Sequence, residues 1–125
     1  MSLSRITLRL ARNPGTEFPN GDERRGYVLV APLDRRGFID EPEWREHHEL
    51  CTVLHFTPDF PAPEHGLLRR RGDNWFFDYE EGNSDDDEPV FKLGVHPFIP
   101  GEYVTVRDEN DRPLTYRVEE VTTPA

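Results

Sequence analysis

Two stretches near the C-terminal end of the sequence decide the fold, EYVTVR at residues 102–107 and LTYRVEEV at residues 114–121. Apolar and polar side chains alternate in both stretches. This period of two is typical of a β-strand that turns one face to the core and the other to water. The connection between them, residues 108–113, is short and mostly polar. The pattern therefore predicts an antiparallel β-hairpin.

The same reasoning, applied toward the N-terminus, predicts further short strands. Residues 4–10 alternate arginine and threonine with aliphatic side chains. Residues 27–31 instead form a continuous apolar run, which predicts a strand buried on both faces. A Gly72-Asp73-Asn74 turn separates two stretches that read as a second hairpin. The additional predicted strands cover residues 4–10, 27–31, 52–56, 67–71 and 75–80, and residues 90–93 are a candidate for one more short strand.

One segment has the pattern of a helix start. Asp40 is a suitable N-cap, and Pro42 falls in the first turn, where a missing N–H has no cost. Glu41 and Glu43 favour the positive end of the helix dipole. We therefore predict a single short helix over residues 41–50.

Together these elements predict a mainly β (α+β) fold. The expected architecture is a small antiparallel barrel or curved sheet of six to seven short strands, with the helix closing one end. A length of 125 residues fits a single domain over 1–125. No βαβ alternation and no internal repeat are present in the sequence.

The charge distribution restricts the classes of partner. The formal net charge is −10, and residues 81–89 (EGNSDDDEP) form an acidic stretch that we expect to be a mobile loop. Its consecutive acids do not match the alternating spacing of a calcium loop. An acidic domain repels phosphate backbones, so we expect no binding to duplex nucleic acid. No apolar run is long enough to cross a bilayer, and we predict a cytoplasmic protein without a membrane partner.

The most promising binding surface in the sequence is the predicted hairpin over 67–80. Arg69 and Arg71 share one face of its first strand, and arginine beside Trp75 is a common composition of binding hot spots. Adding His96 and Phe98 from a later turn, we predict a groove that favours an anionic or aromatic ligand. The alternative is that these arginines only neutralise nearby acids.

A second candidate site is a cluster of histidine and cysteine. His47, His48, Cys51 and His55 lie within nine residues, and imidazole and thiolate are ligands for zinc. The alternative is a helix C-terminus bearing two histidines, followed by a buried Cys51. A catalytic thiolate is disfavoured there because the helix dipole opposes it at that end.

Two motifs, GxxWxFDY at 72–79 and HxFxxGEYV at 96–104, together with the acidic loop, resemble small acidic bacterial proteins of the domain-of-unknown-function type. The resemblance implies a bacterial cytoplasmic origin and no particular chemistry. We therefore predict a non-catalytic β-barrel binding or interaction module, with a protein or a small molecule as partner and no cofactor. The alternative is a small metal-dependent enzyme or metal-binding protein that uses the histidine and cysteine cluster with zinc.

Overall fold

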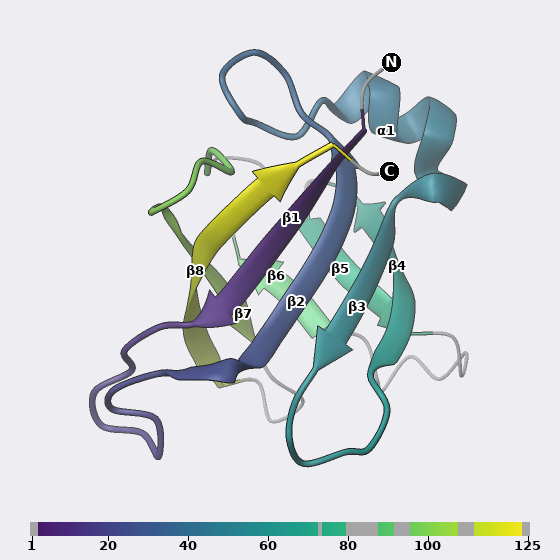
Figure 1. Cartoon of the computed structure of the whole chain (residues 1–125). Helices are drawn as coiled ribbons and strands as arrows, with labels where there is room; N and C mark the ends of the chain where they lie inside the picture. Colours follow the sequence, from purple (N-terminus) through teal and green to yellow (C-terminus); the bar gives the residue numbers. More distant parts are fainter. Residues whose placement is uncertain (1–2, 73, 80–87, 92–95, 108–111, 124–125) are drawn as a thin grey trace.

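Strands in the computed structural model follow one another around a closed antiparallel barrel (Figure 1). The structure describes residues 3–72, 74–79, 88–91, 96–107 and 112–123. Among these residues there are eight strands, and each pairs with its neighbours in sequence, while the last pairs back onto the first. They are β1 (Leu3–Leu10), β2 (Asp22–Pro32), β3 (Thr52–Phe56), β4 (Glu64–Arg71), β5 (Asn74–Tyr79), β6 (Glu88–Phe91), β7 (Tyr103–Arg107) and β8 (Pro113–Thr122).

The mainly β prediction is confirmed, and the alternating side chains fill the barrel. Ile6, Leu8 and Leu10 of β1 are buried inside, and Val104 and Val106 of β7 do the same from another wall. The predicted hairpin of β7 and β8 forms with Thr105 opposite Thr115. Ladder pairing around a closed ring leaves no open sheet edge among the described strands.

The prediction that residues 27–31 are buried on both faces is wrong. Tyr27, Leu29 and Ala31 are buried, but Val28 and Val30 are partly exposed on the outer surface of the barrel. The physical reason is that no second layer covers this part of the barrel wall, so one face of β2 meets solvent even though its side chains are apolar.

Several strands begin earlier than the sequence pattern suggested. β2 begins at residue 22, five residues before the strand predicted over 27–31, because Asp22 pairs with Leu10 across an irregularity in the ladder. β4 begins at Glu64, opposite His55 of β3. The strand predicted at 90–93 begins at Glu88. Cross-strand hydrogen bonding, which the period-two pattern does not report, extends each of these strands into polar sequence.

The predicted helix is confirmed and closes one end of the barrel (Figure 1). It consists of α1 (Glu41–His47) followed by a single 3-10 turn, η1 (His48–Leu50). The Asp40 carboxylate accepts a hydrogen bond from the backbone N–H of Glu43, as an N-cap does. The Trp44 indole N–H donates to the Leu68 carbonyl at 2.9 Å, which fixes the helix to β4.

We call the barrel end that α1 covers the closed end. Trp44 meets the buried Trp75 edge-on, with ring centroids 4.9 Å apart. Ile39 and Cys51 are buried beside them in the same core cluster. Phe98 is also buried, and its backbone N–H donates to the Gly37 carbonyl in the connection that leads to α1.

Most of the predicted acidic loop over 81–89 lies outside the described residues, apart from 88 and 89, which begin β6. None of the helices in the described ranges has the length and apolar character needed to cross a bilayer.

Candidate functional site

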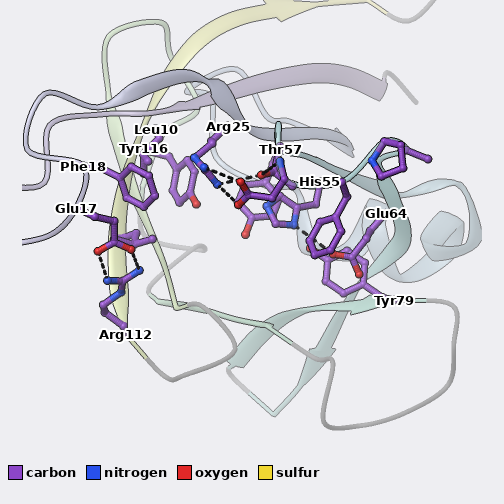
Figure 2. A pocket seen from close by; sticks show the side chains of 16 residues that line it. Leu10, Glu17, Phe18, Arg25, His55, Thr57, Glu64, Tyr79, Arg112 and Tyr116 are labelled. Carbon is purple, nitrogen blue, oxygen red and sulfur yellow. Dashed lines mark hydrogen bonds and ion pairs between the residues drawn. The ribbon is translucent and has the colours of Figure 1, made fainter.

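A cavity of about 660 Å³ opens between the loops that follow β1 and β3 (Figure 2), and these loops lie at the barrel end opposite α1 in Figure 1. We call this the open end. An eight-stranded barrel has an interior just wide enough to be filled by side chains or to hold one small ligand, and the cavity volume falls in the range of small-molecule sites. Its aromatic wall consists of Phe18, Tyr27, His55, Phe60, Tyr79 and Tyr116. Its charged side chains are Glu17, Arg25, Asp59, Glu64 and Arg112.

The cavity forms where the inward-facing side chains change from aliphatic to polar aromatic. Tyr27, His55 and Glu64 lie directly opposite one another across β2, β3 and β4. The next inward position on β4 is Gly66, whose missing Cβ allows the β5 backbone to approach: an added Cβ would lie 2.5 Å from the Asp78 carbonyl oxygen. The row therefore puts an imidazole between a phenol and a carboxylate on a tightly paired stretch of sheet.

Stacked rings make the inner part of the cavity rigid. The Tyr27 ring stacks on His55 with centroids 4.6 Å apart and an interplanar angle of 15°. It also meets Tyr116 edge-on at 5.1 Å and Phe77 at 5.1 Å. Offset and edge-on ring pairs are favourable beyond their buried area, by about 0.5–1.5 kcal/mol each. A preformed wall of this kind reduces the ordering cost of ligand binding.

Hydrogen bonds and one aromatic ring fix the position of the Arg25 guanidinium. It donates to both Asp59 carboxylate oxygens, at 2.6 and 3.0 Å, and to the Thr57 hydroxyl at 2.9 Å. Its Nε donates to Asp22, and its guanidinium lies over the Phe18 ring. The hydrogen bonds from Arg25 lower the pKa of the Asp59 carboxyl below its usual value. This network fixes the loop between β3 and β4 to the start of β2.

Arg112 and Glu17 form a second ion pair on the cavity wall. The two guanidinium nitrogens of Arg112 donate to the two Glu17 oxygens at 2.6 and 2.7 Å. These bonds lower the pKa of Glu17 from 4.5 to about 2. The pair joins the β1–β2 loop to the start of β8, residues far apart in sequence.

The remaining charged side chain of the cavity wall is Glu64. Its Oε1 lies 3.6 Å from Nδ1 of His55, and its side chain is 49% exposed. Tyr79 also lines the cavity, and its ring centroid lies 6.4 Å from that of His55 (Figure 2). A carboxylate, an imidazole and phenols around one cavity can bind a polar or charged head group while the rings contact its apolar part.

The residues predicted from the hairpin are placed elsewhere. Arg69 forms an ion pair with Asp78 on the outer face of the barrel, and Arg71 lies over the Phe76 ring. Trp75 and Phe98 are buried at the closed end, and His96 is partly buried. None of these five residues lines the cavity at the open end.

The histidine and cysteine cluster is divided between the two ends. His47 and His48 lie on the surface at α1 and η1, whereas His55 faces the open-end cavity. Cys51 is fully buried, and its thiol points toward the His47 carbonyl at 3.5 Å. Burial, followed by the charge of Glu49, raises the pKa of this thiol from 9.0 to about 11. Zinc binding by these residues stays a prediction.

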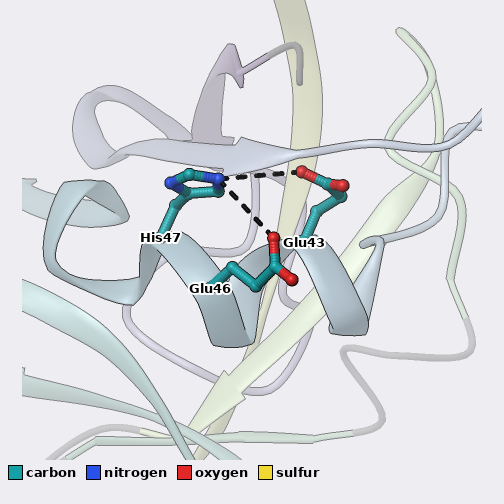
Figure 3. A group of neighbouring side chains, drawn as sticks. All are labelled: Glu43, Glu46 and His47. Atoms are coloured by element: carbon teal, nitrogen blue, oxygen red, sulfur yellow. Dashed lines mark ion pairs between the residues drawn. The ribbon is translucent and has the colours of Figure 1, made fainter.

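One group in the described part of the chain brings three potential metal-ligand side chains together. Glu43, Glu46 and His47 bring their ligand atoms within 4.8 Å of one another on α1 (Figure 3). His47 Nε2 lies 4.0 Å from a carboxylate oxygen of each glutamate. The three residues lie within about one turn of the helix, which already explains this proximity without an ion.

Sequence reasoning missed the open-end cavity. A signal was present: Tyr27, Tyr79 and Tyr116 each place a polar hydroxyl on an inward-facing strand position. Which of these inward positions share one rim depends on the closed topology.

Comparisons with protein-family models, with curated proteins and with solved structures find no match to this chain.

Proposed function

We propose that this protein is a non-catalytic binding module that takes one small organic molecule into the open end of its barrel. The observation that carries the proposal is the 660 Å³ cavity with its rigid aromatic wall. Preformed concave sites with many rings and a few polar groups are the usual form of small-molecule sites. The stacking of Tyr27 on His55 supports a site that is ready before the ligand arrives.

The chemistry of Cys51 favours binding over catalysis by a thiol. A nucleophilic cysteine needs a lowered pKa and access to substrate. The Cys51 thiol is buried, and its pKa is raised to about 11. It also lies in the core of the closed end, whereas His55 faces the cavity of the open end.

A fragment titration followed by two-dimensional NMR tests this function. We expect fragments with one aromatic ring to shift the backbone amide signals of Tyr27, His55 and Tyr116 in a saturable way. Ala62→Trp adds an indole at the cavity wall and should weaken these shifts at least fivefold. Thr122→Trp, on the exposed end of β8 at the other end of the barrel, is the matched control and should leave them unchanged.

Two results would contradict the proposed function. One is a fragment set that moves no signal around the cavity at millimolar concentration. The other is a set of shifts that Ala62→Trp and Thr122→Trp weaken equally, because binding would then not occur in the open-end cavity.

A further inference from the structure

The two cationic side chains of the cavity are already neutralised. Both carboxylate oxygens of Asp59 accept from Arg25, and both oxygens of Glu17 accept from Arg112. Bidentate arginine–carboxylate pairs are among the stronger hydrogen-bonded pairs in proteins. An anionic ligand would have to displace one of these carboxylates before it could use either guanidinium. The cavity therefore gives little attraction to anions.

Glu64 differs from the other two acids of the cavity wall. In the described ranges no arginine or lysine pairs with it, and its charged-group neighbour is the His55 imidazole at 3.6 Å. Among the described side chains, no guanidinium or ammonium group compensates the Glu64 carboxylate. The wall then holds three carboxylates and two guanidinium groups, in a chain whose formal net charge is −10.

The rings of the cavity wall, like the Glu64 carboxylate, favour a cation. The faces of phenol and phenyl rings attract cations, and the attraction increases when the cation leaves bulk water. The face of Phe18 is already occupied by Arg25. Tyr79 and Glu64 both line the cavity, and the centroid of the Tyr79 ring lies 6.4 Å from that of His55, the neighbour of Glu64. Phe60 is 60% exposed on the loop that leads to β4. A carboxylate next to aromatic rings is the combination that recognises an organic ammonium group.

From this arrangement we infer that the ligand of the open-end cavity is an organic cation with an aromatic or similarly apolar body. Its ammonium group binds the Glu64 carboxylate, and its apolar part lies against Tyr27, His55 and Tyr116. The inference rests on the proposed function, since it names the ligand class of the same cavity. It extends that function from a small molecule in general to an amine.

Three probes of matched size separate charge from shape. They are 2-phenylethylamine as the cation, 2-phenylethanol as the neutral analogue and 3-phenylpropanoate as the anion. We expect NMR titration at pH 8 to give a Kd for the amine that is roughly tenfold lower than for the alcohol, since hydrogen bonds to charged groups are the stronger ones. The anion should bind more weakly than the alcohol.

Glu64→Gln removes the charge and keeps the size of the side chain. It should raise the Kd of the amine to about that of the alcohol and leave the alcohol unchanged. Glu49→Gln, an exposed acid of η1 away from the cavity, is the matched control and should change neither. The dispersion of the same spectra reports whether each variant is folded.

The outcomes distinguish the two proposals. An alcohol or an anion that binds the cavity as tightly as the amine overturns the cation assignment and leaves the binding function in place. A preference for the amine that survives Glu64→Gln overturns the role of Glu64. Failure of all three probes to shift the cavity signals overturns the binding function and the cation assignment together.

Discussion

The same strands form both ends of the barrel, but the interior is filled differently at each end. At the closed end, α1 covers the interior, and Trp44 packs against a core that includes the buried Trp75 and Cys51. At the open end, the inward positions carry Tyr27 and His55, and a cavity remains in the barrel interior. Buried apolar area stabilises the first end, and hydrogen bonds and ion pairs organise the second.

The two ends therefore differ in the kinds of side chain that they contain. Apolar side chains at the closed end need no partner except one another. The charged side chains of the open end are costly to bury without partners. They lie at the mouth of the cavity, outside the buried rings of Tyr27, Tyr79 and Tyr116. Buried side chains at both ends stabilise the fold, but only the open end combines them with accessible charged groups that can bind a ligand.

The largest expected effect comes from removing a ring at each end. Trp75→Ala, at a site only 5% exposed, should lower the free energy of unfolding by about 3–5 kcal/mol. Phe60→Ala, at a site 60% exposed, should change it by no more than about 0.5 kcal/mol. Guanidinium denaturation followed by far-UV circular dichroism measures both. Similar losses for the two variants would break the comparison.

A smaller effect is expected from the thiol of the closed end. Folding raises the pKa of Cys51 from 9.0 to about 11, because burial disfavours the thiolate. Its contribution to stability is therefore fully present below about pH 9 and is lost as the pH rises toward 11. The free energy of unfolding, measured from pH 8 to 11.5, should fall more steeply for the native chain than for Cys51→Ala. Parallel curves would show that the thiol reaches solvent.

The smallest effect is expected at the open end, where Glu17 and Arg112 are both well exposed. The Arg112 hydrogen bonds hold the pKa of Glu17 at about 2, so the contribution of this pair is present above about pH 4.5 and is lost as the pH falls toward 2. In Arg112→Gln, the carboxyl carbon signal of Glu17 should titrate near 4.5. Arg24→Gln, which removes a cation paired with Asp22, should not move it. An unchanged titration in Arg112→Gln would mean that this ion pair is absent in solution.

Local sequence determined the elements of this protein. Alternation in residues 4–10, 102–107 and 114–121 predicted strands that the structure confirms, because a period of two is a property of each strand alone. Asp40 and Pro42 located the start of the helix for the same reason, since capping involves only neighbouring residues.

Closure and register were decided only in the tertiary structure. Pairing of β8 with β1 makes eight strands a ring, and it requires contacts between the two ends of the chain that no local pattern encodes. The same long-range pairing extends β2 and β4 into polar sequence and aligns Tyr27, His55 and Glu64 across three strands. Each of these side chains taken alone is an ordinary inward or loop residue. They become one site because backbone hydrogen bonds between strands set the register, and the register decides which side chains lie opposite one another. These hydrogen bonds do not depend on side-chain identity.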